Sequence, residues 1–180
     1  MKIAIYGAGG VGAYFGGRLA RAGADVHLIA RGEHLEALQT GALDVESIHG
    51  DFSVDLPATY DPGEIGACDF VLLCVKSFDT RSAARKMEPL LGEDTAVISL
   101  QNGVDNEDVL AEEIGRERVM GGLAYIFSTI AEPGAIAHTD GPARIIYGEL
   151  DGARSDRAER FDELCERADG MEGILSEDIW

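Results

Sequence analysis

Residues 2–12 read KIAIYGAGGVG, and this stretch decides the fold of the chain. Its first part, Lys2 to Tyr6, is a short apolar run with β-branched residues, which predicts a strand. The pattern G-x-G-x-x-G follows, and the apolar residues Val11, Phe15 and Leu19, spaced four apart, predict a helix over residues 10–22. A glycine loop between a strand and a helix is the context in which this pattern binds the pyrophosphate of a dinucleotide.

Each glycine of the loop has its own physical reason. Gly7 permits the tight turn, Gly9 lets the main chain approach the pyrophosphate, and Gly12 lets helix and strand pack closely. The phosphates would meet free N–H groups and the positive end of the helix dipole. The alternative is a glycine-rich turn that serves packing alone. We predict a dinucleotide site on the loop residues Gly7, Ala8, Gly9, Gly10, Val11 and Gly12.

The rest of the chain alternates between apolar runs and helical patterns. Apolar runs at 25–30, 69–75 and 95–100 predict further strands buried on both faces, and helical patterns lie at 78–91 and 106–114. This alternation predicts an α/β fold, a Rossmann-type doubly wound and mostly parallel sheet.

Additional elements are expected around this sheet. Residues 43–56 predict a β-hairpin that turns near His49, and residues 120–150 predict three strands separated by Gly/Pro turns. Residues 155–168 predict an acidic amphipathic helix. Ser176, followed by acidic residues, predicts the start of another helix.

The residue after the second strand bears on the choice of nucleotide. An NAD site normally has Asp or Glu there, whereas this chain has Ala30 followed by Arg31. A guanidinium can bind a 2′-phosphate through two hydrogen bonds. We therefore expect NADP(H), with Arg31 as a ligand. The alternative is that Arg31 is a solvated surface charge and Glu33 binds the ribose.

Two polar residues follow predicted strands. Lys76 comes after the run 69–75, and Asn102 comes after the run 95–100. Alone, such a lysine usually caps or snorkels, and an Asn-Gly pair is usually a turn. Ligands of open α/β sheets bind beyond the carboxyl ends of the strands, so these two residues and the glycine loop point to one crevice.

Composition excludes several functions. The chain has 180 residues and a formal net charge of −18, which argues against nucleic-acid binding. No apolar run approaches the ~20 residues of a membrane span, and the N-terminus does not resemble a signal peptide. The three cysteines lack metal-ligand spacing and are expected to be free thiols in a reducing cytoplasm.

The histidines are weaker candidates. His138 lies in a predicted turn, where hydrogen bonding is a simpler role than catalysis, and His27 fits a structural place in a strand. His34 and His49 are expected to be exposed. The sequence has neither a nucleophile elbow nor an HExxH motif, so hydrolase and metalloenzyme functions lack support.

Five motifs occur together: GAGGVG from Gly7, Arg31, KSFDT from Lys76, QNG around Asn102, and EPGAIAHT from Glu132. In this order and spacing the chain resembles the ketopantoate reductase (2-dehydropantoate 2-reductase) family over essentially its whole length. The resemblance implies an N-terminal Rossmann-type domain that binds NADPH and a helical C-terminal domain that completes the active site. The implied reaction reduces 2-dehydropantoate, a small 2-keto acid, to pantoate for pantothenate and coenzyme A synthesis.

The resemblance also assigns roles to residues. It implies that the glycine loop binds the pyrophosphate and that Arg31 binds the 2′-phosphate. Lys76 and Asn102 would line the nicotinamide end, with Asn102 also near the substrate. Ala124 begins a segment, residues 124–128, that would touch the cofactor.

The family's general-acid lysine follows a tryptophan at the start of the helical domain. This chain ends at Trp180, so no catalytic residue is expected within it. We expect residues 1–172 to form the NADP-binding domain, residues 173–180 to begin the helical domain, and the chain alone to be inactive. Apolar surface left uncovered would favour self-association, possible as a homodimer.

Two alternatives remain open. One is the NADP-binding domain of another 2-keto-acid or opine-type dehydrogenase; Arg31 and the KSFDT and QNG motifs argue against the opine type. The other is a non-catalytic nucleotide-binding module.

Overall fold

The computed structural model describes residues 1–179, and within them the strands form one mixed sheet. Its order is β4-β3-β9-β8-β7-β6-β1-β2-β5, and β10 also pairs with β9. The run from β8 to β5 is parallel, as predicted. The parallel strands that support the glycine loop are β1 (Lys2–Tyr6), β2 (Asp25–Ile29), β5 (Ala58–Thr59), β6 (Cys68–Leu73) and β7 (Leu91–Ser99).

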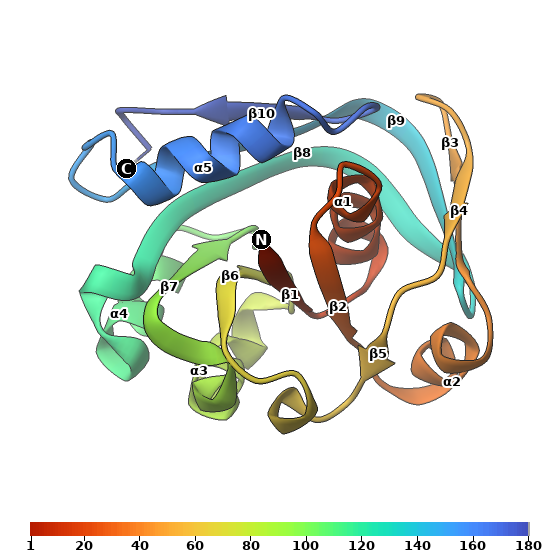
Figure 1. Ribbon diagram of the computed structural model, residues 1–180, viewed down its shortest axis with the longest axis horizontal. Helices are drawn as coiled ribbons and strands as arrows, with labels where there is room; N and C mark the ends of the chain where they lie inside the picture. The colour runs from red at the N-terminus through yellow and green to blue at the C-terminus, as the bar shows by residue number, and fades with distance from the viewer. Residues whose placement is uncertain (180) are drawn as a thin grey trace.

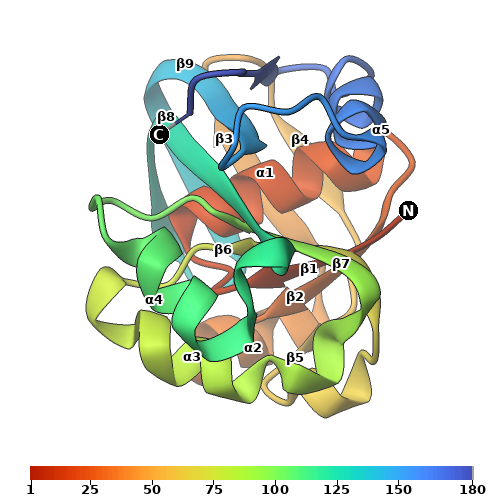
Figure 2. The same ribbon diagram turned by 90° about the vertical axis from the view of Figure 1, so that its left-hand side faces the viewer.

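Helices cover both faces of these parallel strands (Figure 2). Successive residues of β1 point to opposite faces: Ile3 and Ile5 enter one core cluster with α1 and α5, while Ala4 and Tyr6 enter another with α3 and α4. This double burial explains why the strands are continuously apolar. The helices are α1 (Gly10–Arg21), α2 (Gly32–Thr40), α3 (Thr80–Lys86), α4 (Asn106–Ile114) and α5 (Asp156–Cys165), with 3₁₀ turns at Pro62–Glu64, Ser77–Asp79, Glu88–Leu90 and Arg116–Arg118.

A long antiparallel hairpin continues the sheet and arches over α1 (Figure 1). It consists of β8 (Val119–Glu132) and β9 (Ala135–Glu149). Along the outer edge of β9 lie β3 (Leu43–Ser47), which pairs in parallel and carries β4 (Phe52–Val54) as the predicted hairpin, and β10 (Glu172–Leu175). The sheet therefore curls around α1.

The α1 helix has glycines where it meets its neighbours. A Cβ added to Gly16 would lie 2.7 Å from Ile5 of β1, and one added to Gly17 would lie 2.7 Å from Phe52 of β4. Both are closer than a real Cβ contact allows, so the strands can approach this helix only because these side chains are absent. Every residue from Gly12 to Leu19 is buried.

Two predicted elements are wrong in extent. The helix predicted over 78–91 is only Thr80–Lys86, because Pro89 cannot supply a backbone N–H to continue it. Pro89 is instead the second residue of the 3₁₀ turn Glu88–Leu90. The three strands predicted over 120–150 are two. Gly141 and Ala143 adopt positive φ angles of 91° and 48°, so the chain bulges inside β9 and pairing resumes at Arg144.

The end of the chain also differs from expectation. Residues 176–179 contain no helix, and residues 172–175 form β10, which pairs with β9 across the predicted domain boundary. The division of the protein into domains stays a prediction. Within residues 1–179, no helix combines the length and the apolar character needed to cross a membrane.

Candidate dinucleotide-binding site

The glycine loop is held tightly at the carboxyl end of β1. Gly7 has a φ of +100°, and its N–H and that of Ala8 both donate to the carbonyl of Ile29, at 3.1 and 2.9 Å. A Cβ on Gly7 would lie 2.9 Å from the backbone nitrogen of Val75, and one on Gly12 would lie 2.5 Å from the Gly7 carbonyl oxygen. The turn and the close helix–strand contact thus require these two glycines.

The absence of a side chain at Gly9 has a different explanation. A Cβ built on it would meet no atom within 4 Å, so it faces open space rather than protein. A side chain at this position would enter the open space at the start of the helix. That space fits a pyrophosphate that approaches the main chain.

The first turn of α1 supplies donors toward that space. Its first helical hydrogen bond runs from Ala13 N–H to the carbonyl of Gly9, at 2.8 Å. The N–H groups of Gly10, Val11 and Gly12 have no backbone acceptor among the described residues. Since they lie at the positive end of the helix dipole, they suit an anionic group.

β8 forms a wall beside the loop. A Cβ on Gly10 would lie 2.4 Å from the Ser128 carbonyl oxygen, so β8 lies directly against the loop. Of the predicted cofactor segment 124–128, Ser128 is therefore set against the loop. Ala124 lies in the middle of β8, where it pairs with Ile145 and packs on the core.

Arg31 directly precedes α2, and its side chain is 80% exposed. Its Nη2 lies 4.0 Å from Oδ2 of Asp79, and such an exposed pair holds a guanidinium weakly. The charge of Arg31 is thus available to a phosphate. Glu33, the alternative ligand for the ribose, is also exposed and lies in the first turn of α2.

Lys76 and Asn102 occupy matching positions on neighbouring strand ends. Leu73 of β6 pairs with Ser99 of β7, and each polar residue follows its strand by three positions. Both are exposed. Since β1 lies directly beside β6, the loops that carry them border the glycine loop at one edge of the sheet.

The histidines depart in part from expectation. His34 is buried, not exposed, because its ring packs beneath the turn at Gly134. His138 is also buried, with Nδ1 2.8 Å from Oγ of Ser47. Burial lowers the pKa of His138, and the nearby His49 lowers it further. A neutral histidine enclosed in this way fits a structural role.

The three cysteines are free thiols, as predicted. Burial raises the pKa of Cys74 to about 12 and that of Cys165 to about 12. Burial also raises the pKa of Cys68 to about 11. All three thiols are therefore protonated near neutral pH and are not activated nucleophiles.

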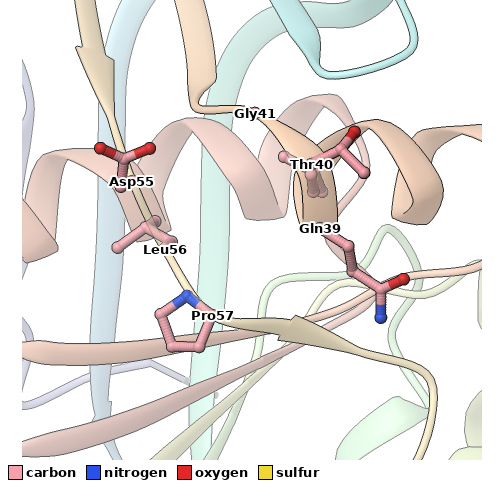
Figure 3. Close-up of a pocket in the computed structure, with 7 residues that line it drawn as sticks. Gln39, Thr40, Gly41, Asp55, Leu56 and Pro57 are labelled. Carbon is pink, nitrogen blue, oxygen red and sulfur yellow. The ribbon is translucent and has the colours of Figure 1, made fainter.

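An open groove of about 390 Å³ lies between the C-terminal end of α2 and the segment that links β4 to β5 (Figure 3). It is lined by residues 38–41 and 55–57. Asp55 is its one ionisable residue. None of the predicted site residues lines it, and it lies at the opposite end of α2 from Arg31.

A parallel sheet, a strand–glycine loop–helix unit and a cationic residue after the second strand define a Rossmann-like domain of the NAD(P)-dependent oxidoreductase class. Residues 3–152 match the family described as ketopantoate reductase PanE/ApbA. The chain belongs to this family.

Individual relatives agree with the family match. The chain is 33% identical over 200 residues to a 2-dehydropantoate 2-reductase of Mesorhizobium japonicum, covering 99% of this chain and 61% of the relative. A PanE/ApbA family ketopantoate reductase structure from Ralstonia eutropha is 36% identical, with a TM-score of 0.89, over 99% of this chain and 57% of that one. A D-mandelate dehydrogenase solved with NADH and anilino(oxo)acetate shares the fold, with a TM-score of 0.83 at 24% identity, over 99% of this chain and 58% of that one. The chain spans 60% and 61% of the length of two of the curated relatives it matches, and 45% of another.

Sequence reasoning missed the buried residues behind the site. His34 contacts a turn 100 residues away, and Thr80, Gln101 and Asn106 are buried between the loops that carry Lys76 and Asn102. For Thr80, Gln101 and Asn106, the only sequence signal was that Gln101 directly precedes Asn102.

Proposed function

We propose that this chain is the NADP(H)-binding part of a cytoplasmic 2-dehydropantoate 2-reductase. The observation that carries the proposal is the open, donor-rich start of α1 with the exposed Arg31 near it, in a chain that belongs to the ketopantoate reductase family. The proposed NADP-binding domain covers residues 1–172, and residues 173–180 lead into the helical domain, with a homodimer as a possible assembly.

The residues of the chain divide into three binding roles. The N–H groups of the glycine loop bind the pyrophosphate, and Arg31 binds the 2′-phosphate, where a carboxylate would repel it. Lys76 and Asn102, on neighbouring strand ends, hold the nicotinamide end. Ala124 begins the β8 segment 124–128 that we assign to contact with the cofactor, and Ser128 is its residue nearest the loop.

The chemistry is reduction of a small 2-keto acid. When bound, NADPH supplies a hydride to the keto carbon. The side-chain amide of Asn102 is the group of this chain that donates a hydrogen bond at the substrate. The alkoxide that develops needs a proton, which we assign to a lysine beyond Trp180, so this chain orients the donor and does not complete the reaction.

The test is a pair of titrations and an assay on the 180-residue chain. We expect NADPH to bind at least about tenfold more tightly than NADH, as one charge-assisted contact allows. We expect no detectable oxidation of NADPH with 2-dehydropantoate, because we assign the general acid and the wall that orients the substrate to segments outside these 180 residues. Binding of neither nucleotide contradicts the proposal. Turnover by the chain alone contradicts the assignment of roles and makes Lys76 the first residue to test.

A further inference from the structure

Three buried polar side chains connect the loops that carry Lys76 and Asn102. They are Thr80, Gln101 and Asn106, and they are 1%, 7% and 5% exposed. Buried polar groups of this kind are costly unless each is hydrogen bonded. Their partners therefore show what they hold in place.

Gln101 connects the second loop to the first. Its Nε2 donates to the carbonyl of Val75 at 2.8 Å and to Oγ1 of Thr80 at 2.9 Å. Its Oε1 accepts from Oγ of Ser99 at 3.3 Å. Because a backbone carbonyl can only accept, the contact with Val75 fixes which way the amide faces. The residue held by this bond directly precedes Lys76.

Asn106 connects this set of hydrogen bonds to Asn102, the second candidate residue. Thr80 accepts from Gln101, and its own hydroxyl lies 2.8 Å from the carbonyl of Ser77 and 3.1 Å from Oδ1 of Asn106, either of which can accept its proton. Nδ2 of Asn106 donates to the carbonyl of Asn102 at 3.2 Å. When Thr80 donates to Oδ1 of Asn106, the hydrogen bonds run without a break from Gln101 through Thr80 and Asn106 to Asn102.

We propose that Thr80, Gln101 and Asn106 form a positioning network that sets Lys76 and Asn102 in register for the nicotinamide end of the cofactor. All three side chains are buried, so they act through the backbone at Val75 and Asn102 and touch no ligand themselves. A fully satisfied polar network of this kind rigidifies what it connects. This inference rests on the proposed function, because it takes the same crevice as the cofactor site.

The experiment compares two ligands on the 180-residue chain. NADPH occupies the whole site, whereas 2′,5′-ADP carries the adenosine and its 2′-phosphate without the nicotinamide. Thr80→Val removes the hydroxyl at nearly constant volume, and Thr80→Ser retains it as the matched control. Thermal unfolding checks that each variant is folded at the assay temperature.

We expect Thr80→Val to weaken NADPH binding about tenfold and 2′,5′-ADP binding less than twofold, since only the nicotinamide end loses its support. The fluorescence change of the reduced nicotinamide on binding should shrink in parallel. Thr80→Ser should restore both readouts. Should Thr80→Val fail to fold, Gln101→Met, which keeps the length of the side chain and removes its amide, should give the same selective loss.

Other outcomes overturn the inference. An equal loss for both ligands would mean that the network only stabilises the domain, and unchanged NADPH binding in a folded variant would mean that it positions nothing. If the unsubstituted chain binds 2′,5′-ADP and NADPH, the proposed function survives either of these results. If it binds neither, the proposed function fails and the positioning role fails with it.

Discussion

The backbone N–H of Gly134 donates a hydrogen bond of 3.0 Å to Nδ1 of His34, across 100 residues of sequence. This bond ties the turn between β8 and β9 to α2. Because Nδ1 accepts, the neutral ring carries its proton on Nε2, which is buried without a hydrogen-bond partner among the described residues. Burial lowers the pKa of His34, and the backbone of Ala8 only partly opposes that shift.

This arrangement predicts a pH dependence of stability. Since the pKa of His34 is lower in the folded chain than its ordinary value of about 6.5, the folded state binds fewer protons than the unfolded state. The contribution of the neutral ring is therefore complete above about pH 6.5 and is lost as the pH falls below it. His34→Asn keeps an acceptor near the Nδ1 position and does not titrate. The difference in melting temperature between the parent chain and His34→Asn should narrow from pH 7.5 to pH 5.5; a constant difference would contradict the prediction.

Substitutions at two glycines of the loop should have different effects, one on binding and the other on stability. Gly9→Val should abolish NADPH binding with little loss of stability, because the new side chain enters open space where the pyrophosphate would lie. Gly12→Val should destabilise the fold itself, since its Cβ would lie 2.5 Å from the Gly7 carbonyl oxygen. Titration and thermal unfolding of both variants separate the two effects. Normal binding by a folded Gly9→Val chain would show that the loop is not the site.

Arg31 should determine the preference for NADP(H). Arg31→Ala should remove most of the expected tenfold or greater preference for NADPH over NADH and leave NADH binding nearly unchanged, because NADH has no 2′-phosphate. Arg116→Ala, which removes the same charge from an exposed site before β8, is the control for net charge. Equal losses in the two variants would mean that the effect is only long-range electrostatics.

The ion pair between Arg157 and Glu149 should stabilise the attachment of α5. Nε and Nη2 of Arg157 donate to the two carboxylate oxygens of Glu149 at 2.7 and 2.6 Å, which only a guanidinium can do. Arg157→Lys should lower the free energy of unfolding by about 1–2 kcal/mol. Arg154→Lys, whose exposed partners lie 3.6 Å away, should change it by less than about 0.5 kcal/mol. Denaturant unfolding of both variants measures the difference.

Local patterns predicted the parts of the fold that depend on local physics. The strand at Lys2–Tyr6 and the helix at Asn106–Ile114 have the predicted bounds, because burial imposes the apolar spacing that the sequence displays. The glycine loop was predictable for the same reason, since the turn, the cofactor approach and the helix contact all lie within six residues. The assigned binding roles of these residues stay predictions.

The parts that sequence reasoning missed depend on contacts between distant segments. Burial of His34 comes from Gly134, and the Thr80–Gln101 contact spans 21 residues, so neither leaves a periodic signal. The bulge within β9 is another case, because Pro142 normally ends a strand. Here the positive φ of Ala143 lets the chain bend, and β9 resumes its pairing with β8 at Arg144. The pairing with β8 on both sides of the bulge imposes this backbone conformation.

The burial of α1 on every side has a consequence for how a ligand is received. A helix enclosed by β1, β4 and β8 through glycine contacts has no room to shift or rotate, so its first turn acts as a fixed anchor. The Thr80–Gln101–Asn106 hydrogen bonds hold the backbone beside Lys76 and at Asn102, so adjustment to a ligand would fall to the exposed side chains of these two residues. Hydrogen exchange should accordingly show amides of α1 that are protected with or without NADPH, while protection in the two loops rises only when it binds.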